Sequence, residues 1–346
     1  MSRLIILVGI ILCLAMPVSA EEYTMPAVPD AAQELMPVET TSFGKDLWKI
    51  IQEATQRLHP EIIKAAGLCV SVFAVVLLSS IAQTMPADNE HIVRIVVALS
   101  TAVILLQQTG SLIRTASDTI QEMSEYGKQL IPIMAAAMAS QGGITSSTAL
   151  YAGTAVFNAV LSNGIKIVLI PLVHVFLVLS IAGCATGQGT LDKLREFVKW
   201  LTVWILKIVL YFFTGYIGIT GVVSGSADAA TLKAAKLTIS GMIPVVGSIL
   251  SDASEAVLVG AGVMKSAVGI YGVLTLIALW ITPFLQIGIR YLLLKMTAGV
   301  SQLFGSKEIT DLIGAFSEAM GLLLAMTGGV SMMLLISTVC FMKGVG

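Results

Sequence analysis

Charged residues are scarce in this 346-residue chain, at 12% of the sequence, whereas 56% of its residues are hydrophobic. A soluble domain of this length would need more polar surface than these residues supply. The chain has 20 basic and 21 acidic side chains, which gives a net charge of −1. Because no excess of positive charge is left to neutralise phosphates, nucleic acid is disfavoured as a partner. The composition predicts an all-α polytopic membrane helix bundle that contacts lipid.

Side chains that bind metals or form disulfides are also few. One of the four cysteines lies in the leader and three lie in apolar stretches, so neither a disulfide framework nor a zinc site is indicated. The three histidines are too far apart in sequence to suggest a metal cluster, and no cofactor is expected. Walker, His-Glu-x-x-His, Gly-x-Ser-x-Gly and Cys-x-x-Cys motifs are missing, so the sequence does not indicate an enzyme. The residues concerned are Cys13, Cys69, Cys184, Cys340, His59, His91 and His174.

The N-terminus has the features of a secretory signal. Arg3 gives a positive start, residues 4–14 form a short apolar run, and Val18-Ser-Ala20 offers a cleavage site of small residues. We predict a signal peptide over residues 1–20, with an uncleaved anchor as the alternative.

Residues 21–64 are expected outside the cytoplasm as a linker followed by an amphipathic helix. Prolines crowd its first part, which favours an extended chain. Apolar residues then recur at helical spacing, which predicts a helix on the outer membrane surface or against a partner. Packing against the chain's own bundle is the alternative. The apolar positions are Leu47, Ile50, Ile51, Ala54 and Leu58.

One apolar stretch, residues 240–263, cannot be a single straight membrane helix. Proline lacks an N–H, so a helix begins or bends at it, and two carboxylates at capping-box spacing start a second short helix. Unpaired backbone groups cost several kcal/mol in hydrocarbon, so we expect this hairpin to be enclosed by other spans or to line a wet cavity. The candidate functional residues are Gly241, Pro244, Gly247, Asp252 and Glu255.

The second part of the chain has the pattern of an internal duplication. Pro132 and Pro171 are as far apart as Pro244 and Pro283, and proline is rare in this chain. Each half would contain a re-entrant or short-helix hairpin, a span with a central proline, a basic stretch and another span. The predicted units are 1–20 (signal peptide), 21–64 (linker and amphipathic helix), 65–129 (two spans and an amphipathic segment), 130–223 (first half) and 224–346 (second half).

Basic residues after the spans predict the orientation. Both clusters should be cytoplasmic under the positive-inside bias, which gives six full spans with the N-terminus outside. If the hairpins 130–161 and 240–263 each cross as two short helices, the count becomes ten. The clusters are Lys193, Arg195 and Lys199 in one half, and Arg290, Lys295 and Lys307 in the other.

A few charged residues fall within apolar or amphipathic stretches. Arg94 and Lys207 lie inside predicted spans and are candidate intramembrane charges, although Arg94 is most simply explained by snorkelling to the interface. Residues 110–129 are amphipathic, and Arg114, Asp118 and Glu122 form a charge ladder on one side. Their apolar side consists of Leu112, Ile113, Ala116, Ile120 and Met123.

The stretch around the second hairpin resembles the stage III sporulation protein AE family of endospore-forming bacteria. The resemblance rests on Lys-Leu-Thr-Ile-Ser-Gly-Met-Ile-Pro-Val-Val-Gly-Ser-Ile-Leu-Ser-Asp-Ala-Ser-Glu at 236–255 and on Lys-Ser-Ala-Val-Gly-Ile-Tyr-Gly at 265–272. It extends over nearly the whole mature chain, although this chain is shorter than a typical member before the first span.

The resemblance implies an integral membrane subunit of the channel or secretion complex that links mother cell and forespore and supports late forespore gene expression. Its implied partners are other stage III sporulation proteins, including a cytosolic ATPase and ring-forming proteins. The implied location is the outer forespore membrane. An autonomous secondary transporter is the alternative, although the first hairpin has no carboxylates that match those of the second.

Overall fold

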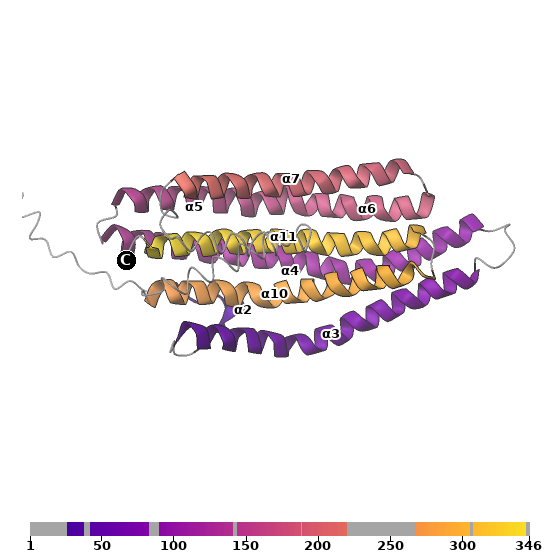
Figure 1. Cartoon of the computed structure of the whole chain (residues 1–346), viewed down its shortest axis with the longest axis horizontal. Coiled ribbons are helices and arrows are strands. Elements are labelled where there is room, and N and C mark those ends of the chain that lie inside the picture. The colour runs from indigo at the N-terminus through magenta and orange to yellow at the C-terminus, as the bar shows by residue number, and fades with distance from the viewer. Residues whose placement is uncertain are drawn as a thin grey trace, which may run out of the picture.

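The computed structural model describes residues 26–37, 42–82, 90–140, 144–187, 189–219, 267–304 and 307–343. In this part of the chain, long helices run side by side along one axis and no strand is present (Figure 1). Six of these helices are long and apolar enough to cross a membrane. The structure therefore confirms the prediction of an all-α polytopic bundle.

The long helices run in alternating directions through the bundle. The C-terminal ends of α3, α6 and α10 lie at one end of the bundle (Figure 1). The C-terminal end of α7 and the start of α10 both lie at the opposite end. This arrangement agrees with the predicted parity of the spans. The elements are α2 (Asp30–Gln33), α3 (Phe43–Ala82), α4 (Glu90–Ser140), α5 (Ile144–Gly164), the π-helix η2 (Ile165–Leu169), α6 (Ile170–Thr186), α7 (Gly189–Ile219), α10 (Ala267–Ser301) and α11 (Lys307–Lys343).

Several helices are longer than a bilayer requires. The 51 residues of α4 extend over about 75 Å at 1.5 Å per residue, whereas the hydrocarbon core is about 30 Å thick. The sequence predicted an amphipathic helix before a separate first span, but α3 joins both in one helix of 40 residues. Ile50, Ala54 and Leu58 are buried. The amphipathic part therefore packs on its own bundle and not on the membrane surface.

The first predicted hairpin, at 130–161, differs from the structure in its arms. The chain does turn back between Ser140 and Ile144, but the arms are the ends of long helices, and Pro132 lies inside α4. No re-entrant or short-helix pair forms here, and the predicted unit boundary at 129/130 falls inside α4. The second hairpin, at 240–263, and the leader at 1–20 lie outside the described residues.

The linker prediction is also wrong for the part that the structure describes. Residues 26–37 include the short helix α2 and pack on the bundle, where Ala32 and Leu35 are buried. The Glu34 carboxylate forms an ion pair with Arg57 of α3. The burial of these two apolar side chains favours packing of the segment onto the bundle. Proline content alone does not predict this packing.

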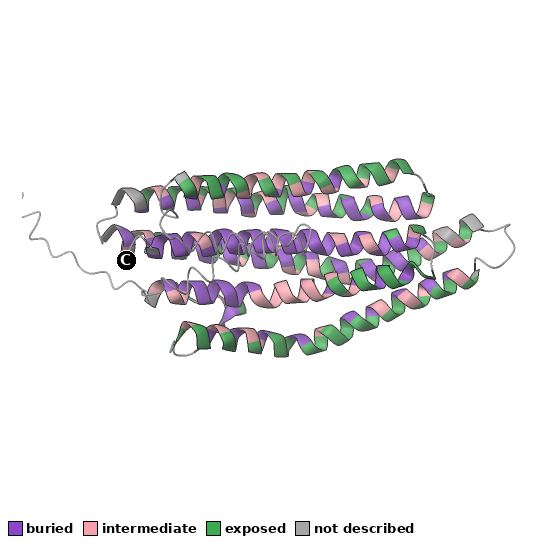
Figure 2. Cartoon of the chain, viewed as in Figure 1, coloured by how far each residue is buried: buried purple, intermediate pink, exposed green. Residues whose placement is uncertain are grey.

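The centre of the bundle is α11. Every residue from 319 to 335 is buried, and Figure 2 shows α11 in the burial colour along most of its length. A helix that is buried all round must be enclosed by neighbours on every side. The outer faces of α3, α4 and α7 carry many of the exposed apolar side chains of the described part, as expected for a surface in contact with lipid or with partner helices.

Candidate functional site

A π-helix interrupts the rod formed by α5 and α6. The Ile170 N–H donates to the Ile165 carbonyl, five residues back, and Pro171 follows immediately. A proline clashes with the carbonyl four residues before it, and the wider π turn relieves this clash without ending the helix. Such π-bulges are frequent at functional sites, and here the bulge lies beside a polar cavity.

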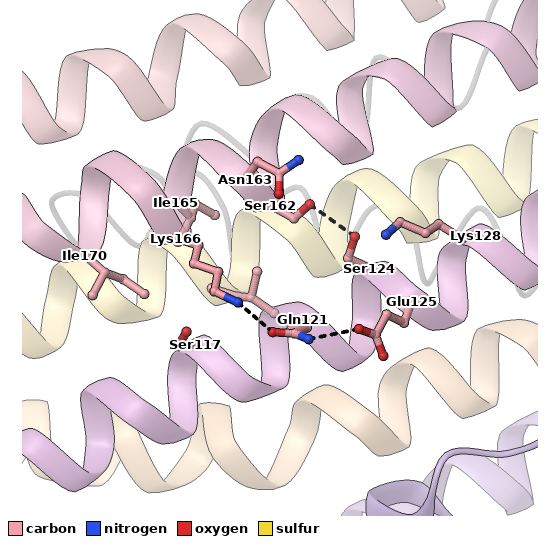
Figure 3. A pocket seen from close by; sticks show the side chains of 11 residues that line it. Ser117, Gln121, Ser124, Glu125, Lys128, Ser162, Asn163, Ile165, Lys166 and Ile170 are labelled. Atoms are coloured by element: carbon pink, nitrogen blue, oxygen red, sulfur yellow. Dashed lines mark hydrogen bonds between the residues drawn. The ribbon is translucent and has the colours of Figure 1, made fainter.

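The cavity has a volume of about 150 Å³ and lies between α4 and the α5–η2–α6 rod (Figure 3). On α4 the polar lining residues recur at helical spacing and so share one face. The rod supplies the opposite wall at the level of η2. The polar lining residues are Ser117, Gln121, Ser124, Glu125 and Lys128 from α4, and Ser162, Asn163 and Lys166 from the rod.

A hydrogen-bonded chain connects a cation to a carboxylate across this cavity. Lys166 Nζ donates to Gln121 Oε1 at 3.0 Å, and Gln121 Nε2 donates to Glu125 Oε1 at 2.9 Å (Figure 3). Hydrogen bonds with one ionised partner are stronger than neutral ones. The amide of Gln121 therefore holds both charged side chains in place at the cavity mouth.

A second hydrogen-bonded network joins α4 to α5 beside the cavity. Ser124 Oγ donates to Ser162 Oγ at 3.1 Å, and Ser162 itself donates to the Asn158 carbonyl at 2.6 Å. Asn158 Nδ2 donates to the Ser124 carbonyl at 3.1 Å, and this asparagine is 1% exposed. Polar bridges between helices suit a membrane bundle, where each contributes about 0.6–2 kcal/mol.

The lining of the cavity is mostly polar. Its walls offer hydroxyl, amide and ammonium groups, but no histidine or cysteine lines them. In the described part of the chain, no group of three or more His, Cys, Asp or Glu side chains could hold a metal ion. Two lysines against one glutamate suit a small polar or anionic group.

The residues predicted from sequence have different outcomes. Gly241, Pro244, Gly247, Asp252 and Glu255 lie outside the described residues, so the hairpin site stays a prediction. Arg94 lies near the start of α4, and its side chain is also outside the described part. Lys207 is exposed halfway along α7 and makes no hydrogen bond or ion pair with any residue that the structure describes.

Arg290 belongs to the basic cluster that the sequence predicts on the cytoplasmic side, and this location stays a prediction, but its side chain is buried and not solvated. Arg290 lies inside α10 and is only 8% exposed, and its guanidinium donates to Gln108 Oε1 of α4. An ionisable side chain buried within a membrane-length helix is a functional candidate. The only sequence signal for it was its place within a continuous apolar helical pattern.

Comparisons with known proteins identify the family. A relative, the stage III sporulation protein AE of Bacillus subtilis (strain 168), is 28% identical over 232 residues, which cover 65% of this chain and 56% of the relative. The chain thus matches little more than half of the relative's length. No solved structure matches. A family model described as stage III sporulation protein AE matches residues 31–344, and the chain therefore belongs to the stage III sporulation protein AE family.

Proposed function

We propose that this chain is a non-enzymatic membrane subunit of a channel or secretion complex that links mother cell and forespore and supports late forespore gene expression. Family membership over residues 31–344 is the observation that carries the proposal. The multi-pass bundle supports it, because six candidate spans make a membrane platform and not a soluble factor.

The proposed partners are other stage III sporulation proteins, including a cytosolic ATPase and ring-forming proteins, and the proposed location is the outer forespore membrane. Two features of the bundle support a role in an assembly. The helices extend beyond the thickness of one bilayer, and the outer faces of α4 and α7 carry unpaired charges among the described residues. A subunit that works alone would have little use for such charges at the bundle surface.

Reconstitution separates this proposal from an autonomous transporter. Purified protein in liposomes is expected to take up no small solute by itself, whereas affinity capture from sporulating cells is expected to retain stage III partners. Solute uptake by the protein alone would remove the proposal, particularly if Lys166→Met abolished that uptake. The same substitution provides the matched test of the polar cavity, since Lys166 is exposed and its loss leaves the core intact.

The second hairpin gives a residue-level test of the proposed function. Pro244→Leu and Asp252→Leu are expected to impair spore formation more than Pro132→Leu and Ser140→Leu. Pro132 is exposed on α4, so leucine there changes little, whereas we expect the predicted hairpin at 240–263 to need its proline break and its carboxylate. Spore counts of complemented strains measure the effect. Equal tolerance at all four positions would count against a special role of this hairpin.

A further inference from the structure

The outward face of α7 combines stacked aromatic side chains with one lysine. Phe197, Trp200 and Trp204 stack in succession with ring centroids 5.9 Å apart, and each is about half exposed. Beyond them, Lys207 is exposed and lacks a partner among the described residues. An unpaired ammonium within an apolar, membrane-length helix is unfavourable, so this face needs a partner of opposite charge.

More aromatic surface follows on the other side of the lysine. Tyr211 and Phe212 are each 70% exposed. The glycines that come next, Gly215 and Gly218, have open space where a side chain would be, which permits the close approach of another helix. The α7 face therefore presents aromatic, cationic and again aromatic surface in that order.

The outward face of α4 carries the complementary order of charges. Arg114 and Lys128 lie at its two ends, and Asp118 and Glu125 are exposed between them, with Glu122 half-buried beside them. Glu125 and Lys128 also border the polar cavity, where Gln121 donates a hydrogen bond to Glu125. None of these five side chains forms an ion pair with a described residue. The α4 face thus presents a cation, an acidic centre and a second cation.

These two faces lie at the same height in the bundle. Phe157 of α5 contacts Phe213 of α7, with ring centroids 5.6 Å apart. Lys207 precedes Phe213 by as many residues as Asn163 follows Phe157, and the two helices are antiparallel, so Lys207 lies level with Asn163. The neighbouring Ser162 bonds to Ser124 of α4. Lys207 is therefore level with the acidic centre of α4.

The same count places the aromatic groups opposite the cations. Arg114 lies level with Phe197 and Trp200, and Lys128 lies level with Tyr211 and Phe212. Arginine and lysine are attracted to aromatic ring faces, so all three parts of the two faces match.

One chain cannot make this contact with itself. The α5–η2–α6 rod packs on both α4 and α7, so these two helices are separated by about two helix spacings of 8–10 Å each, farther than a lysine side chain reaches. Copies inserted in the same direction, in contrast, place the α7 face of one beside the α4 face of the next at equal height. Such a head-to-tail contact builds a ring or a row.

We infer that the outward face of α7 binds the outward face of α4 in a second copy of this chain, with Lys207 paired to the acidic centre formed by Asp118, Glu122 and Glu125. This contact does not depend on the proposed channel role. It gives the exposed lysine its counter-charge and covers the aromatic surface.

Charge reversal tests the contact in the full-length protein. Lys207→Glu is expected to weaken the association of the detergent-solubilised protein and to raise its dissociation constant by more than about tenfold, because the substitution places like charges opposite each other. Adding Glu122→Lys and Glu125→Lys to the same chain should restore association. Lys193→Glu is the matched control, since this exposed lysine of α7 has no acidic residue of α4 at its height. A purified wild type that is monomeric, or a mass that Lys207→Glu leaves unchanged, would overturn the inference.

Cysteine cross-linking tests the same contact without relying on charge. In a background where Cys13, Cys69, Cys184 and Cys340 are serine, a chain with Lys207→Cys is co-expressed with a differently tagged chain with Glu122→Cys. A cross-link between the two tags is necessarily between chains and is expected, whereas Glu53→Cys on α3 should give none. A cross-link no stronger than that of the Glu53→Cys control, or one that joins Lys207→Cys to another protein in place of the second copy, would refute the inference.

Discussion

Gln108→Leu is expected to lower the free energy of unfolding by about 2–4 kcal/mol. Gln108 accepts a hydrogen bond from Arg290, which is 8% exposed and forms no ion pair with any carboxylate in the described part. Leucine removes the acceptor and leaves a buried cation without it. The loss is measured by titrating the purified protein with a denaturing detergent and following its circular dichroism.

The neighbouring Gln107 supplies the matched control. Its side chain is exposed on the same helix, so Gln107→Leu should change stability by no more than about 0.5 kcal/mol. Replacing both partners, as Gln108→Leu with Arg290→Met, should be less harmful than Gln108→Leu alone, because no charge is then left buried. Equal stability of the two single glutamine variants would show that Arg290 does not depend on Gln108.

The double variant also separates stability from function at this position. If Arg290 only holds α10 against α4, a stable double variant should support spore formation as the wild type does. A folded variant that fails to sporulate would assign the guanidinium a role in the working complex, as expected for a buried charge in a candidate membrane span.

The number and class of the helices follow from sequence because hydropathy over a span depends on local composition. Their extents do not. Arg290 interrupts an apolar pattern at a single position, and the helix continues through it, where Gln108 accepts a hydrogen bond from its guanidinium. In α3, the helix continues through Pro60. The amphipathic first part of α3 and the span that follows therefore form one helix. Tertiary contacts decide both cases.

Part of the candidate site was also within reach of the sequence. The amphipathic pattern in 110–129 predicted an outward charge ladder, and Arg114 and Asp118 are indeed exposed, whereas Ile113 and Met123 are buried. The polar cavity was missed because periodicity shows that Gln121 and Ser124 are near the helix surface but not which helix faces them. Only the packing of the π-bulge next to α4 brings Lys166 to Gln121.

Gly153→Ala is expected to destabilise the bundle by about 1–3 kcal/mol, because it overpacks the contact between α5 and α7. An added Cβ would overlap the ring of Tyr216. This ring cannot move freely, since its hydroxyl donates to the Ala149 carbonyl at 2.5 Å and the ring contacts that of Phe157, with centroids 5.8 Å apart. Either the two helices separate or the tyrosine leaves its acceptor. Unfolding in the same detergent titration measures the loss.

Two further variants show whether the clash is the cause. Gly110→Ala on α4 adds the same methyl group where nothing lies within 4 Å, so it should be neutral or stabilise the helix by up to about 1 kcal/mol. Tyr216→Ala removes the obstructing ring at its own cost, and Gly153→Ala should then cause little further loss in that background. If alanine at 153 destabilises the protein equally with and without the Tyr216 ring, close approach of α5 and α7 at this glycine is not what holds these helices together.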